Sequence, residues 1–143
     1  MHSWAHLLLV AGSYTVSFSA TDGSLSETQR LPVTVLNMLL AIPSLTDSPD
    51  PFSPDLNQTT TISASFNQPV TSWTLVLKDS ATVTVRSYSY SGSGLTSMSQ
   101  VWNGKTATGL RVPNGTYTYT LTATAAPGTN GGSATRSGTV RVQ

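Results

Sequence analysis

Gly12-Ser13-Tyr14-Thr15-Val16-Ser17-Phe18-Ser19-Ala20-Thr21, near the start of the chain, returns near its end as Gly115-Thr116-Tyr117-Thr118-Tyr119-Thr120-Leu121-Thr122-Ala123-Thr124. Gly, Tyr, Thr, Ala and Thr fall at the same places in the two copies. Each copy alternates apolar or aromatic residues with Ser or Thr, which is the pattern of a half-buried β-strand. The repeat predicts two related β-sandwich units.

The two copies differ in how much sequence precedes them. Enough residues for a whole sandwich precede the second copy, but only residues 1–11 precede the first. The first unit is therefore predicted to be the back half of a domain. Half a sandwich leaves an apolar face and unpaired strand edges, which are covered by the rest of the chain, by another subunit, or by nothing.

Composition favours an all-β protein. The chain has 143 residues and 38% apolar content, enough for one core and part of another. Charged residues make up 9%, and roughly three residues in ten are Ser or Thr, whereas about a quarter of a typical domain is charged. The straight-chain residues that helices prefer are scarce, so almost no helix is expected.

Charge and cysteine content exclude several functions. The net charge is +1 and the seven Lys and Arg residues are scattered singly, so no nucleic acid partner is expected. Without cysteine there is no disulfide framework, thiolate nucleophile or structural zinc site. The apolar runs at 7–11 and 36–42 are predicted to be a strand and an interdomain connection, and neither is long enough to span a membrane.

Alternation divides the rest of the chain into strands. Residues 12–21 and 31–35 flank an Asp22-Gly23 turn and predict a hairpin within a partial unit, residues 1–36. A linker is predicted at 37–46 and an immunoglobulin-like antiparallel β-sandwich at 47–143. The proline-rich stretch at its start would be a stiff linker or a first edge strand. Six further runs are predicted at 59–67, 72–79, 81–90, 95–102, 115–125 and 134–142.

Side-chain alternation also predicts the core of this sandwich, because residues two apart in a strand share a face. Trp102, just before an Asn-Gly turn, is expected to cap the core. The other predicted core residues are Ile62, Ala64, Phe66, Trp73, Leu75, Leu77, Tyr117, Tyr119, Leu121, Val140 and Val142.

Two motifs carry a family resemblance. Asp50-Pro51-Phe52-Ser53-Pro54-Asp55, followed by Trp102-Asn103-Gly104-Lys105 and Val112-Pro113-Asn114-Gly115-Thr116-Tyr117, resembles the immunoglobulin-like domain of the flagellar hook-capping protein, over residues 44–143. Trp4 and Gly12-Ser13-Tyr14 through Val33-Thr34-Val35 resemble the closing half of cadherin-like or immunoglobulin repeats of bacterial surface proteins. The resemblance implies an extracellular or cell-surface module used for spacing, adhesion or assembly, without catalytic residues.

Metal binding and catalysis have few candidates. Asp47, Asp50 and Asp55 are the candidate calcium ligands, although three spaced acids are also common in solvated loops. Asp55 is followed by Leu56 rather than by the acidic, Gly-rich stretch frequent in the family, which weakens the calcium prediction. No other cofactor is expected. The only histidines lie near the N-terminus and Glu27 is the only glutamate, so no enzymatic activity is predicted.

The sequence thus predicts a non-catalytic extracellular structural or adhesion protein. It would assemble with copies of itself into a filament or surface polymer, by β-strand addition through the N-terminal half-domain. The predicted assembly interface is Tyr14, Val16, Phe18, Leu31, Val33 and Val35.

Two alternatives remain open at this point. The chain could be a spacer among neighbouring domains of a larger secreted hydrolase or surface protein. It could also be a carbohydrate-binding accessory module, with Tyr88 and Tyr90 stacking on sugar rings from one face of a strand.

Overall fold

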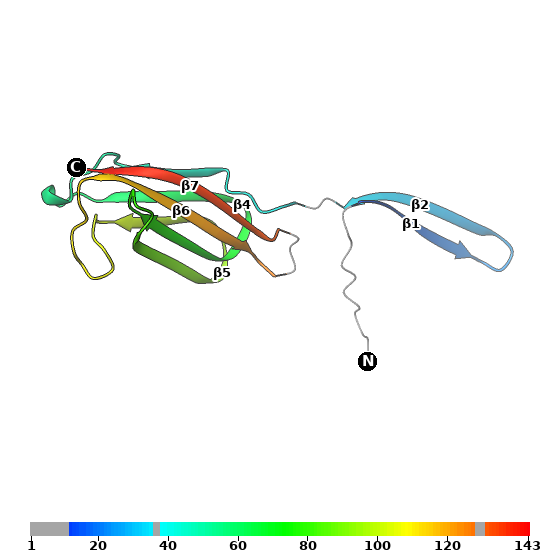
Figure 1. Ribbon diagram of the computed structural model, residues 1–143. Coiled ribbons are helices and arrows are strands. Elements are labelled where there is room, and N and C mark those ends of the chain that lie inside the picture. The colour runs from blue at the N-terminus through cyan, green and yellow to red at the C-terminus, as the bar shows by residue number, and fades with distance from the viewer. Residues whose placement is uncertain (1–11, 36–37, 128–130) are drawn as a thin grey trace. The chain divides into compact units, whose positions relative to one another are not determined.

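The computed structural model describes residues 12–35, 38–127 and 131–143, which form only β-strands, connections and one 3-10 turn (Figure 1). This confirms the all-β prediction. The chain divides into two compact units, residues 1–38 and 39–143. Within the described ranges, no helix is long and apolar enough to cross a membrane. The predictions for residues 1–11, with both histidines, lie outside these ranges.

The described residues of the first unit form one hairpin. Strand β1 (Gly12–Thr21) pairs antiparallel with β2 (Ser26–Val35), without a register shift, from Gly12 opposite Val35 to Thr21 opposite Ser26. Asp22 closes the turn between them, because its Oδ1 accepts hydrogen bonds from the backbone N–H groups of Ser24 at 2.9 Å and Leu25 at 2.8 Å. The hairpin and its turn lie where the sequence predicts them, but β2 begins at Ser26, five residues before the predicted run at 31–35.

The second unit is the sandwich. Its elements are β3 (Ser44–Ser48), η1 (Pro54–Leu56), β4 (Thr60–Lys78), β5 (Thr84–Trp102), β6 (Gly115–Ala125) and β7 (Ser133–Val142). All paired strands are antiparallel, and β4 is central, with β3, β5 and β6 as its neighbours (Figure 1). Strand β7 lies outside β6.

Two strands are longer than predicted. The runs predicted at 59–67 and 72–79 join into β4, and those at 81–90 and 95–102 join into β5. Asn67-Gln68-Pro69 has the composition of a turn, yet here it continues the strand through a bend. The boundary prediction was wrong because turn-forming residues also occur where a strand changes sheets.

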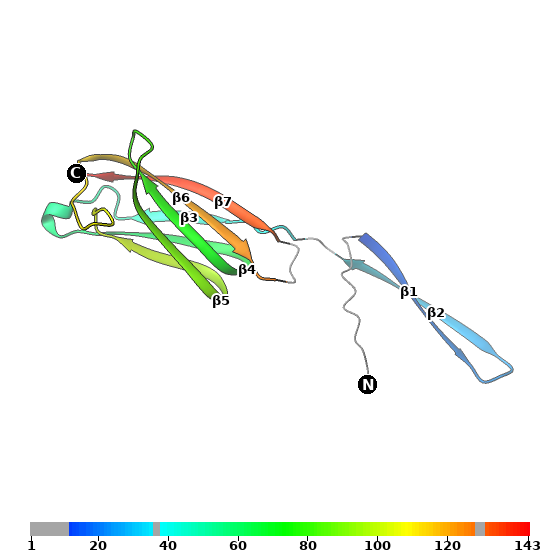
Figure 2. The ribbon, with the colours of Figure 1, turned by 60° about the horizontal axis from the view of Figure 1, so that its bottom comes forward.

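Irregular pairing bends β4. Its register with β6 shifts between Val70 and Ser72, which leaves Thr71 as one extra residue, and the buried positions change parity from Phe66 to Trp73. On β5, a Cβ added at Gly94 would lie 2.9 Å from Pro69 Cβ, so the two strands approach closely at this bend. Figure 2 shows the second half of β4 beside β5.

The bend builds the two layers of the sandwich. Trp102, at the end of β5, pairs with the first residue of β4, while Tyr117 lies beside the pairing of Lys78 with Thr118 at the other end of β4. A straight strand of that length would separate these ends by roughly 60 Å. The two rings are instead 5.4 Å apart, edge to face, so the β4–β5 pair doubles back around the core.

The predicted core is confirmed by burial. All the core residues named from the sequence are at most 7% exposed. Trp102 is completely buried, lies 5.5 Å from the Phe52 ring and donates its Nε1–H to the Lys105 carbonyl at 3.0 Å. It caps the core as expected.

The segment before the sandwich is held more tightly than a linker. Leu40 and Ile42 are buried, and the Leu40 N–H donates to the Gly131 carbonyl at 2.9 Å. Phe52, further along the proline-rich stretch, is fully buried and its N–H donates to the Arg141 carbonyl at 3.1 Å. Residues 39–46, predicted as linker, therefore pack as part of the second unit because their apolar side chains complete its core.

Gly138 leaves room for a tyrosine ring. It lies opposite Tyr119 in the β6–β7 ladder, and a Cβ at Gly138 would collide with the phenol end of that buried ring. We expect Gly138→Ala to lower the free energy of unfolding by about 1–3 kcal/mol through overpacking. The adjacent exposed Thr139→Ala should change it by less than about 0.5 kcal/mol. Urea unfolding of both variants checks this, and equal losses would contradict it.

Candidate interaction surfaces

The hairpin gathers all six predicted interface residues on one face. Directly opposed residues of an antiparallel pair point to the same side of the sheet. Tyr14 faces Val33 and Val16 faces Leu31 across the ladder, with Phe18 and Val35 on the same side. The result, here called the apolar face, consists of Tyr14, Val16, Phe18, Leu31, Val33 and Val35.

The apolar face is exposed. Phe18 is 61% exposed, Leu31 56% and Val16 39%, and no residue described in the hairpin is buried. The opposite face is polar, with Ser19 and Thr28 joined by a hydroxyl hydrogen bond of 3.1 Å across the strands. Because a two-stranded sheet is marginally stable by itself in water, this hairpin requires a partner surface.

The three candidate calcium ligands lie at separate contacts. Asp47 Oδ1 accepts a hydrogen bond from the Tyr119 hydroxyl at 2.5 Å, and Asp50 Oδ1 accepts one from the Arg141 backbone N–H at 2.8 Å. Asp55 forms an ion pair with Arg111. In the ranges that the structure describes, no group of three His, Cys, Asp or Glu side chains is placed to hold a metal ion.

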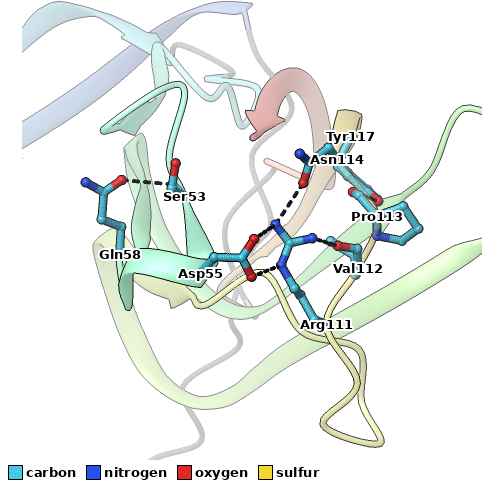
Figure 3. Close-up of polar contacts among 8 residues, drawn as sticks. All are labelled: Ser53, Asp55, Gln58, Arg111, Val112, Pro113, Asn114 and Tyr117. Carbon is cyan, nitrogen blue, oxygen red and sulfur yellow. Dashed lines mark hydrogen bonds and ion pairs between the residues drawn. The ribbon is translucent and has the colours of Figure 1, made fainter.

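Arg111 connects two loops at one end of the sandwich (Figure 3). Its Nε and Nη2 lie 2.5 and 2.7 Å from the two Asp55 carboxylate oxygens, the bidentate geometry that guanidinium groups favour. Nη2 also donates to Asn114 Oδ1 and Nη1 to the Val112 carbonyl, each at 2.7 Å. These contacts hold η1 against residues 111–114. The guanidinium group of Arg111 is therefore bound by groups of the protein itself. Arg111 is not among the residues predicted from the sequence, although it directly precedes the Val112-Pro113-Asn114 motif.

Tyr88 and Tyr90 share one face of β5, as predicted for a sugar-stacking pair. Tyr90 stacks on Trp73 of β4, with ring centroids 6.2 Å apart and an interplanar angle of 16°. The Arg86 guanidinium lies over the Tyr88 ring, 5.0 Å from its centroid. Both tyrosines are half-buried against the core. Each ring thus has a contact within its own sandwich.

Comparison with known proteins identifies relatives of the second unit. A family model described as FlgD Ig-like domain matches residues 52–126, which confirms the resemblance to the hook-capping domain. No curated protein matches the chain. The resemblance of the hairpin to surface-protein repeats stays a prediction.

Two solved structures from Porphyromonas gingivalis are similar. One is dimeric latent PorU, with a TM-score of 0.57 and 16% identity, over 94% of this chain and 12% of that one. The other is PorZ, described as an essential surface component of the type-IX secretion system, with a TM-score of 0.42 and 18% identity, over 69% of this chain and 11% of that one. The chain therefore spans about an eighth of the length of these structures or less, and the PorU likeness concerns the fold.

Asp47 should make stability depend on pH. Partial burial raises the pKa of its carboxyl, the Tyr119 hydrogen bond offsets part of this, and Asp50 raises it further. The folded state therefore binds a proton more readily than the unfolded one, so this group adds stability as the pH falls toward 3.8.

We expect the isosteric Asp47→Asn variant to keep the Tyr119 hydrogen bond and lose this dependence. The free energy of unfolding of the variant minus that of the original chain should decrease between pH 7 and pH 4. Urea unfolding at several pH values measures it. A difference that increases on acidification would show a lowered pKa instead.

Proposed function

The chain belongs to the FlgD Ig-like domain family through residues 52–126, and from this premise we propose a non-catalytic structural module at the bacterial cell exterior, which joins copies of itself by β-strand addition. The observation that carries the proposal is the apolar face of the β1–β2 hairpin. Six apolar side chains on one side of a two-stranded sheet are typical of a surface that another sheet covers.

Strand addition would both pair the edge of the hairpin and bury its apolar face. Extended partners supply hydrogen bonds to the free backbone groups of an edge strand, and their sheet buries side chains such as Phe18 and Leu31. Each large apolar side chain that becomes fully buried contributes about 1.5–3 kcal/mol before the cost of association. Repeated from copy to copy without closure, such a contact produces a filament.

The non-catalytic and extracellular parts of the proposal have separate support. The carboxylates of Asp47 and Asp55 are engaged by Tyr119 and Arg111, which supports a non-catalytic role. The family resemblance supports the exterior location, and so does a composition in which Ser and Thr outnumber charged residues.

A spacer role is the second candidate. Support comes from PorU, in which the region that resembles 94% of this chain is 12% of a much longer polypeptide. In this alternative, the hairpin and the sandwich would be consecutive parts of a series of domains in one surface protein. Sugar binding by Tyr88 and Tyr90 is less favoured, because Arg86 and Trp73 already contact their rings.

Particle mass distinguishes the two candidates. We expect the full chain to form oligomers or polymers in light scattering and negative-stain microscopy, and residues 39–143, the whole second unit, to stay monomeric. A full chain carrying Phe18→Ser and Leu31→Ser should lose most of its assembly, because both side chains leave the apolar face. The matched variant Ser17→Ala with Arg30→Ala, on the opposite face, should keep it.

Monomers at all concentrations, for the full chain and the truncated chain alike, would refute self-assembly and favour the spacer. Polymers formed equally by residues 39–143 would place the contact on the sandwich instead of the hairpin.

A further inference from the structure

The sequence repeat extends to the whole hairpin. The β1–β2 ladder begins with Gly12 opposite Val35 and ends with Thr21 opposite Ser26. The β6–β7 ladder begins with Gly115 opposite Val142 and ends with Thr124 opposite Ser133. Both ladders thus have the same length and the same residue pairs at their ends. The second strands also match, with Ser26, Thr28, Val33 and Val35 aligning with Ser133, Thr135, Val140 and Val142.

Cross-strand pairs within the two hairpins correspond as well. The Ser19–Thr28 hydroxyl pair of β1–β2, at 3.1 Å, aligns with the Thr122–Thr135 pair of β6–β7, also at 3.1 Å. On the other face, Val16 opposite Leu31 aligns with Tyr119 opposite Gly138. The first hairpin thus has two medium-sized side chains where β6–β7 has a large ring opposite a glycine. The two pairs fill similar volumes with different side chains.

The two corresponding faces also differ in how far other strands cover them. On β6–β7, the residues aligned with the apolar face are at most 3% exposed where they carry side chains, as for Tyr117, Leu121 and Val142. On β1–β2, Phe18 and Leu31 are more than half exposed. The described part of the first unit therefore has the structure of the last two strands of a sandwich.

The two edges of the hairpin have opposite character. Strand β2 carries Pro32, Glu27 and Arg30, features that protect an outer edge from further pairing. Strand β1 carries neither proline nor charge. In the second unit a similar division holds. Strand β7, which carries two arginines, is the last strand of the sheet and pairs on its outer side with Phe52 at its end, whereas β6 is uncharged and lies between β7 and β4.

We propose that the edge of β1 opposite β2 is an acceptor for one antiparallel strand of the β4 type, the neighbour that the corresponding strand β6 has in the second unit. The acceptor rests on the strand addition of the proposed function and specifies its edge, direction and register. In the second unit, Leu75 lies opposite Leu121 and Leu77 opposite Tyr119. Carried over, a leucine of the incoming strand would lie opposite Phe18 and the next inward residue opposite Val16.

The chain's own β4 segment supplies the probe. A fluorescent peptide of residues 70–80 is titrated with the full chain, and its anisotropy is measured. We expect saturable binding, and none for a control peptide with Ser in place of Trp73, Leu75 and Leu77, because only the alternate apolar residues match the apolar face. A nitroxide at the peptide's N-terminus should broaden amide NMR signals near Thr21 rather than near Gly12, since the strands run antiparallel.

A matched pair of variants in the full chain tests the face. Val16→Lys places a charge on the apolar face and should weaken peptide binding at least about tenfold, whereas Thr15→Lys, with the same charge on the opposite face, should stay within about threefold. Should Val16→Lys unfold the hairpin, Val16→Ser gives the same comparison with Thr15→Ser.

The outcomes separate this proposal from self-assembly. A monomeric chain that binds the peptide at β1 would support the acceptor edge and refute association between copies. Polymers that neither bind the peptide nor dissociate in its excess would overturn the acceptor edge. Broadening along β2 instead of β1 would overturn it as well.

Discussion

The bend of β4 at residues 66–72 is the feature on which the rest of the sandwich depends. Its first half pairs with β3 and β5 and its second half with β5 and β6, so one strand contributes to both layers. The extra residue in its register with β6 and the close approach of Gly94 to Pro69 permit the turn. Because of it, Trp102 and Tyr117 meet across the core although they pair with opposite ends of β4.

The strands and the core could be predicted from the alternation of apolar and polar residues. Successive side chains of a strand point to opposite faces, so burial of one face requires an apolar residue at every second position. Ile62, Leu75 and Val140 are examples whose burial follows from their neighbours alone. The continuity of β4 could not be predicted, since Asn67-Gln68-Pro69 has the composition of a turn in isolation. The Arg111–Asp55 pair could not be predicted either, because its partners are 56 positions apart and meet only after the sandwich closes.

Some features of the hairpin are specified by its own sequence, whereas the burial of its apolar face is not. Its register, its turn at Asp22 and the common side of its six apolar residues follow from the chain itself. The cover of that face does not, because Phe18 and Leu31 find no cover in the hairpin. The repeat in β6–β7 nevertheless shows, within the same molecule, what cover such a hairpin receives when the remaining strands are present.

The paired hydroxyls on the outer faces of both hairpins have a consequence for the environment in which the protein can work. Ser19 with Thr28 and Thr122 with Thr135 form hydrogen-bonded pairs that carry no net charge. Dissolved ions screen charged groups over a distance that shrinks with ionic strength, but they leave neutral hydroxyl pairs almost unaffected. Hydration of these faces should therefore be nearly the same in dilute and in saline water.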